Sequence, residues 1–292
     1  MTPTADRVAL DDWYAVGVSR EITRSAPRRT RLLGQDILVE RDSAGTPCVF
    51  AVDADGRRRA QRAKELYGHV WTTLGAPSRP LFSMPEFDEP GRRLVLCGTA
   101  TVRTSPLRIV ENFLDMSHFP YVHTGVLGEE PETAVADYKV EIRQPENELW
   151  ATECAFYQPQ AAMSATGGQI SRYEYRVPSP CVTVLYKTCP AVEGAWDLVG
   201  IFVQPRDEAV CDVHIFMLLF DDISSTESLI HFQQMIFLQD RSILENQQPP
   251  GLPLDPASET AVRADRSSMA YRRWLREQGL TFGTARAAAD AA

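Results

Sequence analysis

Between residues 136 and 219 the chain repeatedly alternates strand-like segments, rich in apolar and β-branched residues, with short runs of turn residues. The six segments are 136–142, 149–157, 170–177, 181–188, 198–204 and 210–219. Strands that follow one another in this way, without helices between them, are typical of an antiparallel sheet. The pattern therefore predicts a large antiparallel sheet in this part of the chain.

Helical patterns flank these strands. Three stretches have apolar residues at helical spacing, at 107–118, 224–247 and 261–278. Ser225 or Thr226 is a suitable cap for the start of the long middle helix, and two prolines follow its end. We expect the alanine-rich tail after Thr284 to be frayed.

Residues 1–90 have a different sequence pattern. Short strand-like runs, at 31–41, 47–52 and 67–74, are separated by turns that contain aspartate and glycine. Several prolines between residues 77 and 90 then suit an irregular linker. These features predict two units, a small β-rich region at 1–90 and a second domain at 91–292.

The overall charge excludes some classes of partner. The chain carries 30 basic and 39 acidic residues, a formal charge of -9, whereas nonspecific nucleic-acid binding needs a basic surface. The most apolar run, 215–220, is too short to span a bilayer, and the N-terminus lacks the pattern of a secretory signal. We therefore expect a soluble cytoplasmic protein that binds neither nucleic acid nor membrane.

One short basic run stands out against this acidic background. It consists of Arg57, Arg58, Arg59 and Arg62. Asp53, Asp55 and Glu65 lie close by in the sequence, so the simplest interpretation is a solvated loop and the start of a helix. The alternative is a docking patch for an acidic redox partner.

The cysteines do not form a recognisable metal site. They are scattered as Cys48, Cys97, Cys154, Cys181, Cys189 and Cys211, with no C-x-x-C pair. In a cytoplasmic protein such cysteines are usually reduced and buried. Cys211 and His214 form a lone C-x-x-H, but the apolar residues around them predict a buried strand.

The segment NFLDMSHFPYVH, which begins at Asn112, holds two of the five histidines of the chain. Asn112, Asp115 and His118 are three residues apart, which places them on one face of a helix. On a straight helix His123 would point about 140° away from His118. Pro120 disturbs the helix between them, and this break would let both imidazoles converge.

A metal site needs further ligands besides two histidines. Asp115 is placed to accept a hydrogen bond from a histidine ring. A metal-binding histidine usually donates such a bond from the ring nitrogen that does not contact the metal. The best third ligand is Asp240, since a carboxylate within a mostly apolar helix is costly unless it is paired or binds a metal. The alternatives are a surface ion pair between Asp240 and Arg241, and Glu245 as the ligand. Two histidines and one carboxylate form the facial triad of non-heme Fe(II) oxygenases.

The order and separation of these residues resemble the catalytic domain of Rieske non-heme iron oxygenases. The shared pattern is N-x-x-D-x-x-H-x-x-x-x-H and then Q-D-x-x-x-x-E, here Asn112, Asp115, His118, His123, Gln239, Asp240 and Glu245. The resemblance implies an α+β fold of the helix-grip type, in which an antiparallel sheet wraps around long helices. It implies that His118, His123 and Asp240 bind iron. It also implies catalytic roles for Asn112 and for Asp115, the latter as a bridge to an incoming cluster.

The chain departs from that family in its N-terminal region. A Rieske cluster needs a C-x-H and a later C-x-x-H, because two thiolates and two imidazoles hold its irons. Before residue 100 the chain offers only Cys48, Cys97 and His69. The segments RLLGQDILVERDSAG and ELYGHVWTTLG nevertheless resemble the flanks of a Rieske domain. Residues 1–90 thus resemble a Rieske domain without its cluster-binding hairpins, and we expect no iron–sulfur cluster in this chain.

This truncated layout resembles the Rieske-less subunit of bacterial methylxanthine N-demethylases, which removes an N7-methyl group. The segments ENFLDMSHFPYVHT, YKTC, FVQP and AYRRWL contribute to the resemblance. It implies Fe(II), O2 as cosubstrate, and N-demethylation of a 7-methylxanthine-like substrate with release of formaldehyde. It also implies that NADH supplies electrons through a partner Rieske protein or reductase. A trimer or hetero-oligomer is expected, with the partner docked near residues 41–66.

Two other functions stay open at this point. The chain could be an O-demethylase or a ring hydroxylase that acts on another aromatic substrate. It could also be a non-catalytic structural subunit of an oxygenase complex, although the intact histidines and Asp240 disfavour this.

A flat, neutral heteroaromatic substrate requires an apolar pocket with a few polar anchors. Gln233 lies seven residues before Asp240, nearly two helical turns, so it projects from the same helix face. Ile236 and Phe237 lie between them. We expect Gln233 to orient the substrate, with Ile236 and Phe237 beside it. The alternatives are that Gln233 faces solvent, or that Gln234 takes this role.

Overall fold

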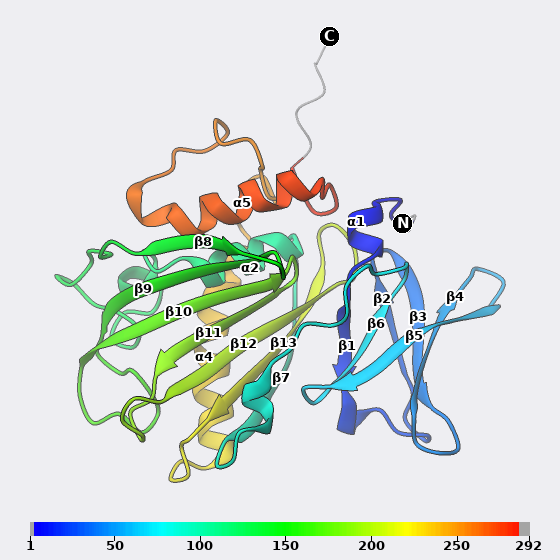
Figure 1. Cartoon of the computed structure of the whole chain (residues 1–292), viewed down its shortest axis with the longest axis horizontal. Coiled ribbons are helices and arrows are strands. Elements are labelled where there is room, and N and C mark those ends of the chain that lie inside the picture. The colour runs from blue at the N-terminus through cyan, green and yellow to red at the C-terminus, as the bar shows by residue number, and fades with distance from the viewer. Residues whose placement is uncertain (1–2, 286–292) are drawn as a thin grey trace.

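A computed structural model describes residues 3–285 of the chain. Two antiparallel sheets lie side by side, and the longer helices are associated with the larger sheet (Figure 1). The structure confirms the predicted α+β class and the antiparallel sheet. Most of the alanine-rich tail lies outside the described residues.

The N-terminal sheet has six strands in the order β1-β6-β5-β4-β3-β2. They are β1 (Tyr14–Val18), β2 (Arg28–Leu32), β3 (Gln35–Arg41), β4 (Pro47–Val52), β5 (Arg58–Leu66) and β6 (His69–Thr73). The predicted single strand at 31–41 is in fact two strands. Leu33 and Gly34 turn the chain between them, with φ angles of 51° and 81°.

Most of the basic run lies on a strand, so the expected helix start was wrong, whereas Arg57 lies in the loop before that strand. Arg58, Arg59 and Arg62 belong to β5, which pairs with β4 on one side and β6 on the other. Cross-strand contacts favour this placement, since the Arg58 guanidinium lies 6.0 Å from the centre of the Phe50 ring and 3.4 Å from Glu40. The arginines remain largely exposed.

The second sheet has seven strands in the order β7-β13-β12-β11-β10-β9-β8. They are β7 (Arg93–Val102), β8 (Lys139–Arg143), β9 (Glu148–Gln158), β10 (Gln169–Ser179), β11 (Val182–Thr188), β12 (Trp196–Pro205) and β13 (Cys211–Leu219). All six strands predicted between residues 136 and 219 are present, with ends that move by no more than three residues. β7 pairs with β13 at the edge of this sheet.

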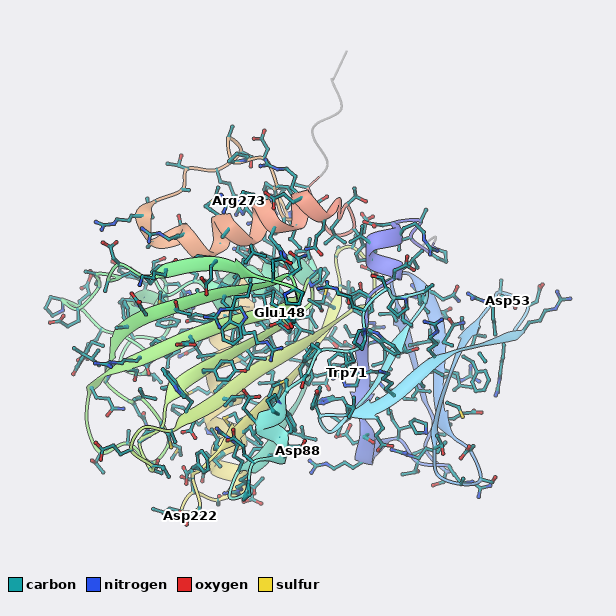
Figure 2. The ribbon with its side chains drawn as sticks, viewed as in Figure 1. Asp53, Trp71, Asp88, Glu148, Asp222 and Arg273 are labelled. Atoms are coloured by element: carbon teal, nitrogen blue, oxygen red, sulfur yellow. The ribbon has the colours of Figure 1, made fainter. Side chains whose placement is uncertain are left out.

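Side chains of β12 and β13 alternate between the two faces of this sheet. Phe202 and Phe216 face the N-terminal sheet, and the Trp71 ring of β6 packs 4.7 Å from the Phe202 ring, between the two sheets (Figure 2). Val199 and Met217 are cross-strand partners on the opposite face. That opposite face lines a cavity beneath the longest helix.

The described residues contain five α-helices. They are α1 (Arg7–Leu10), α2 (Pro106–Leu114), α3 (Phe119–Val122), α4 (Thr226–Leu244) and α5 (Arg266–Gln278). Ser225 caps α4, because its side-chain oxygen accepts a hydrogen bond from the Ser228 N–H at 3.1 Å. The second sheet curves around α4, and α5 runs along the edge formed by β8 (Figure 1). This is the helix-grip arrangement.

None of the helices in the described part of the chain combines the length and the apolar character needed to cross a bilayer.

Candidate metal centre

A sharp turn, and not a continuous helix, brings the two histidines of the motif together. α2 ends at Leu114, so Asp115 and His118 do not lie on a helix face as the spacing had suggested. The Asp115 carboxylate accepts hydrogen bonds from the Ser117 N–H at 2.8 Å and the Ser117 hydroxyl at 2.5 Å, and these bonds favour a turn over a further helical turn. Pro120 does not break the helix either, since it lies in the first turn of α3, where proline is tolerated.

Contacts with α5 hold the end of α2 in place. The Ser267 hydroxyl donates a hydrogen bond to the Leu114 carbonyl at 2.9 Å, which satisfies one of the carbonyls that a helix end leaves free. Glu111 of α2 is buried between Arg108 and Arg272, at 2.9 and 2.5 Å. The start of the histidine segment is therefore fixed by packing and by buried ion pairs.

His118, His123 and Asp240 direct three possible ligand atoms toward one point. The Nε2 atoms of the two histidines are 3.2 Å apart. Asp240 Oδ1 lies 3.3 Å from His118 Nε2 and 3.0 Å from His123 Nε2. All three ligand atoms lie within 4.8 Å of one another. Because Asp240 comes from α4, the cluster joins two segments that are far apart in the sequence.

Each member of this cluster is oriented by a hydrogen bond with a neighbouring side chain. The pairs are Asp115 Oδ2 with His118 Nδ1 at 3.0 Å, Gln239 Oε1 with His123 Nδ1 at 2.8 Å, and Asn112 Nδ2 with Asp240 Oδ1 at 3.1 Å. When both rings carry their proton on Nδ1, both Nε2 atoms keep a lone pair for a metal ion. The sequence pattern included Gln239, but its contact with His123 was not foreseen.

The charges in the cluster suit a cation. Burial raises the pKa of Asp240, but hydrogen bonds with His118 and His123 outweigh burial and hold that pKa below its usual value. Burial lowers the pKa of His118, but Asp115 and Asp240 outweigh it and raise that pKa to about 9. The two carboxylates thus draw positive charge to the point where the ligand atoms meet. Two imidazoles and a carboxylate with this charge fit a divalent iron ion.

Glu245, the rival carboxylate, does not belong to this cluster. It lies at the C-terminal end of α4, where its Oε1 accepts hydrogen bonds from the Arg103 N–H and from Arg241 Nε, each at 3.1 Å. Arg241 therefore pairs with Glu245, and Asp240 turns inward to the histidines.

The lone C-x-x-H does not form a pair either. Cys211 and His214 are three residues apart on β13, so their side chains point to opposite faces of the sheet. His214 Nδ1 lies 2.8 Å from the Thr99 hydroxyl, and its Nε2 lies 3.2 Å from Gln204 Oε1. All six cysteines are free, and five of them are buried.

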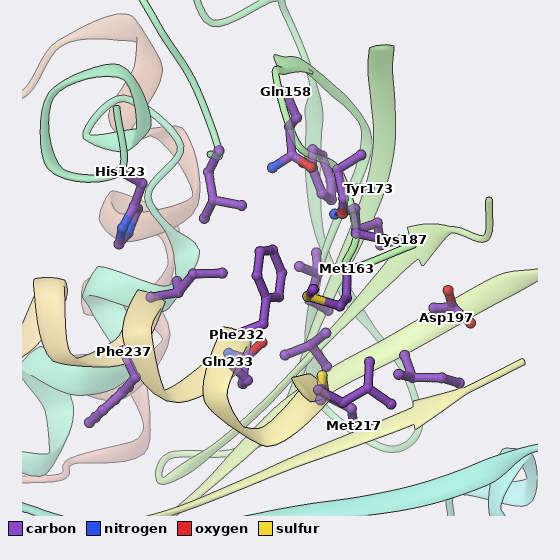
Figure 3. Close-up of a pocket in the computed structure, with 18 of the residues that line it drawn as sticks. His123, Gln158, Met163, Tyr173, Lys187, Asp197, Met217, Phe232, Gln233 and Phe237 are labelled. Carbon is purple, nitrogen blue, oxygen red and sulfur yellow. The ribbon is translucent and has the colours of Figure 1, made fainter. Parts of the chain in front are cut away.

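A cavity opens beside the cluster, between α4 and the second sheet (Figure 3). Most of its walls are apolar, and they include Phe119, Leu185, Val199, Ile201, Met217 and Phe232. The predicted pocket residues Gln233, Ile236 and Phe237 all line it. Gln233 is buried, whereas Gln234 is exposed and donates a hydrogen bond to the Cys97 carbonyl at 2.8 Å. Of these two glutamines it is Gln233 that reaches the cavity.

Several polar residues of the cavity wall were not foreseen. Four of them come from the neighbouring strands β9, β10, β11 and β12, namely Gln158, Tyr173, Lys187 and Asp197. In the sequence they look like ordinary strand residues. Only the strand register shows that they share one face.

A second cavity reaches the cluster from the side of α5. Arg108, Glu111, Glu259 and Arg272 give it a charged lining. Asp115 lines this second cavity and does not line the first. The cluster therefore lies between an apolar cavity and a charged one, and Asp115 faces the charged side.

Comparisons with known proteins agree with this architecture. The family described as "Vanillate O-demethylase oxygenase C-terminal domain" matches residues 102–279. "Probable methylxanthine N7-demethylase NdmC" of Pseudomonas sp. (strain TJI-51) is 44% identical over 277 residues, which cover 95% of this chain and 97% of that protein. "Methylxanthine N1-demethylase NdmA" of Pseudomonas putida is 26% identical over 230 residues, which cover 73% of this chain and 59% of that protein.

Solved structures share the fold. NdmA of Pseudomonas putida CBB5 with caffeine superposes with a TM-score of 0.74 at 18% identity, over 91% of this chain and 89% of that one. Dicamba monooxygenase bound to dicamba gives a TM-score of 0.73 at 13% identity, over 94% and 98%. At these identities the superpositions establish the fold alone.

The family match spans more than half of the chain, and the 44% relative covers almost all of it. The matched region contains the cluster of His118, His123 and Asp240. The chain is an oxygenase subunit and belongs to the Rieske non-heme iron oxygenase family, as a member whose sequence lacks the C-x-H motif of a Rieske cluster.

Proposed function

We propose that this chain uses O2 to remove an N-methyl group from a methylxanthine, with 7-methylxanthine as the type of substrate and formaldehyde as the second product. The observation that carries the proposal is the convergence of His118, His123 and Asp240 at the wall of an apolar cavity. The 44% identity to a protein named as a probable methylxanthine N7-demethylase supports the choice of substrate.

Three residues would hold Fe(II), namely His118 and His123 through Nε2 and Asp240 through Oδ1. The bound metal supplies the place at which O2 is activated by two electrons. Asp115 and Gln239 keep the two rings in the tautomer that offers Nε2, and Asn112 holds the carboxylate of Asp240. In this arrangement the ligand atoms need little reorganisation when the metal binds.

The reaction balances with two electrons and two protons from outside the chain. One oxygen atom of O2 inserts into a C–H bond of the N-methyl group, and the other leaves as water. The hemiaminal then breaks its C–N bond, which releases formaldehyde and leaves N–H on the ring. Ile236 and Phe237 line the cavity near Asp240, and there they exclude water and hold the flat ring.

Gln233 is the polar group on α4 that would set the orientation of the ring. It is buried and lines the cavity, and its amide makes no hydrogen bond within residues 3–285. The amide can therefore bind a carbonyl or a ring nitrogen of the substrate without giving up a contact in the protein.

The two electrons would come from NADH through a partner that carries a Rieske cluster. The sequence of this chain holds no C-x-H and no G-x-G-x-x-G dinucleotide fingerprint. Asp115 supports entry of electrons from the side of α5, because it contacts His118 and faces the charged cavity. A hetero-oligomer of this chain with its partner is the expected working form.

The proposed function is tested by measuring products. The iron-loaded chain, supplied with NADH and a Rieske reductase, should convert 7-methylxanthine to xanthine and formaldehyde in equal amounts. If formaldehyde is released only from a methoxylated aromatic substrate, the result would instead favour the O-demethylase alternative. A hydroxylated ring without formaldehyde would favour the ring hydroxylase, and both results would contradict N-demethylation.

A substitution of Gln233 tests how the substrate is oriented. We expect Gln233→Leu to lower kcat/KM for the methylxanthine about tenfold, because one hydrogen bond to the substrate is lost. Gln234→Leu is the matched control, since Gln234 lies next in the chain but contacts Cys97 outside the cavity. Equal kinetics of the two variants would show that Gln233 does not orient the substrate.

A further inference from the structure

Three polar side chains form a row across the cavity wall, at the end away from the histidines. Tyr173 of β10 pairs with Lys187 of β11, and Lys187 pairs in turn with Asp197 of β12. Directly paired residues of neighbouring strands point to the same face, so the three side chains stand next to one another. Figure 3 shows His123 on one side of the cavity and this row on the other.

Lys187 has hydrogen-bonding capacity to spare. An ammonium group carries three donors, and within residues 3–285 the Lys187 Nζ donates to one acceptor, the Ala161 carbonyl. Asp197 is its cross-strand neighbour but is not among its ion-pair partners in the described chain. Burial lowers the pKa of Lys187 to about 7, and the charge of Asp197 opposes this shift. An acceptor from a bound ligand would satisfy the free donors.

Gln158, at the end of β9, shows the same lack of partners. Its side chain is 1% exposed and lines the cavity. Its buried Oε1 has no hydrogen-bond partner, and no hydrogen bond of its Nε2 is present in the described chain. Buried amides are normally paired, so this one calls for a partner that is absent from the chain itself. The hydroxyl of Tyr173 is buried and unpaired in the same wall.

We propose that Gln158 and Lys187 form a recognition subsite for the imide or lactam edge of a planar heterocycle, in which a ring carbonyl stands beside a ring N–H. Lys187 donates to the carbonyl oxygen. The Gln158 amide carries an acceptor and a donor side by side, so it matches a ring N–H and the carbonyl next to it.

This inference rests on the proposed function and specifies how the substrate lies. The six-membered ring of a methylxanthine that keeps a ring N–H has such an edge, and its N7-methyl group lies on the five-membered ring. With the edge formed by N3–H and the C2 carbonyl, which lies on the side of the ring opposite N7, at Gln158 and Lys187, the N7-methyl group would point toward the end of the cavity where His118, His123 and Asp240 converge. The subsite would therefore select both the substrate class and the methyl group that reacts.

Ligand binding, measured without turnover, tests the subsite. The iron-loaded chain is titrated calorimetrically under argon, without a reductase, with 7-methylxanthine and with 1,3,7-trimethylxanthine, which has no ring N–H. Wild type should bind 7-methylxanthine at least about tenfold more tightly, since the trimethyl compound leaves Gln158 Oε1 unpaired. Lys187→Met should weaken binding of 7-methylxanthine about 10- to 100-fold through loss of a charge-assisted hydrogen bond. Gln158→Leu should weaken it about five- to tenfold.

Two substitutions of the same chemical kind serve as controls. Lys139 is exposed on β8 and pairs with Glu153, so Lys139→Met should leave binding unchanged. Gln169 pairs with Gln158 across β9 and β10 but does not line the cavity, so Gln169→Leu should also leave it unchanged. Lys187→Gln keeps a polar side chain and provides a second variant at that position, should Lys187→Met fail to fold.

The outcomes separate this inference from the proposed function. Unchanged affinity for 7-methylxanthine in folded Lys187 and Gln158 variants would overturn the subsite and leave N-demethylation standing. If wild type bound no methylxanthine but bound uracil in a manner that depends on Lys187, the subsite would stand and the methylxanthine function would fall. Binding of neither class of ligand would overturn the subsite.

Discussion

Alanine at His118, His123 or Asp240 is expected to abolish iron binding and turnover. Each substitution removes one of the three ligand atoms that meet within 4.8 Å, and the remaining two do not complete the facial triad that holds a divalent iron ion. Iron content after reconstitution with Fe(II) and desalting measures the effect. Stoichiometric iron in any of the three variants would show that the metal is held elsewhere.

Two nearby residues provide matched controls for this experiment. His231 is an exposed histidine on α4, and Glu245 is engaged by Arg103 and Arg241. We expect His231→Ala and Glu245→Ala to retain iron at the level of wild type. A loss of iron in Glu245→Ala would restore the rival assignment of Glu245 as the carboxylate ligand.

Asp115→Ala should behave differently from the ligand variants. Asp115 orients His118 through a hydrogen bond of 3.0 Å and does not belong to the ligand cluster. Loss of a hydrogen bond to a metal-binding histidine typically lowers metal affinity about 10- to 100-fold, so the variant should keep most of its iron at high Fe(II) concentration. Turnover should be lost, because the proposed path of electrons to the metal passes through Asp115. Normal turnover of this variant with its physiological donor would refute the bridging role.

The second large effect concerns the source of electrons. We expect the isolated chain to show no multiple turnover with NADH and O2, and to become active when a Rieske reductase is added. A single iron can supply electrons only by changing its own oxidation state, and the sequence offers no cluster or dinucleotide motif that would accept a hydride. Sustained demethylation by the isolated chain with NADH alone would contradict this dependence.

The place where the partner docks can be probed in the same assay. β4 and β5 project from the side of the N-terminal sheet that lies away from the second sheet (Figure 1). Arg58, Arg59 and Arg62 lie on β5 and are largely exposed, so they can attract an acidic partner. Reversal of their charge should raise the concentration of reductase needed for half-maximal activity, and added salt should weaken the wild-type interaction in the same direction.

The parts of the fold that the sequence predicted well are those in which local pattern and burial agree. The strands between residues 136 and 219 were found within three residues, because β-branched and apolar residues fill them and turn residues separate them. The prediction of a single strand at 31–41 was wrong because Leu33, a residue type that does not signal a turn, adopts a positive φ before Gly34. The predicted helix start at Arg58 and its neighbours was wrong because cross-strand pairing outweighed the helix propensity of these residues.

In the candidate site, too, some features could be predicted from local sequence pattern and others could not. Spacing and residue type picked out His118, His123 and Asp240, and the structure brings the three ligand atoms together, while their role as iron ligands stays a prediction. Spacing alone gave the wrong local conformation at Asp115, where a side-chain turn replaces the last turn of the helix. The row formed by Tyr173, Lys187 and Asp197 depends on the register of three strands, which no local pattern in the sequence records.

The central claim is that this chain holds one mononuclear iron at His118, His123 and Asp240 and depends on a cluster in another protein. Metal and acid-labile sulfide analysis of the purified, Fe(II)-reconstituted chain tests it most directly. The account predicts one iron per chain, which the His118→Ala variant loses, and no acid-labile sulfide. Stoichiometric sulfide, or iron that survives in the His118→Ala variant, would contradict it.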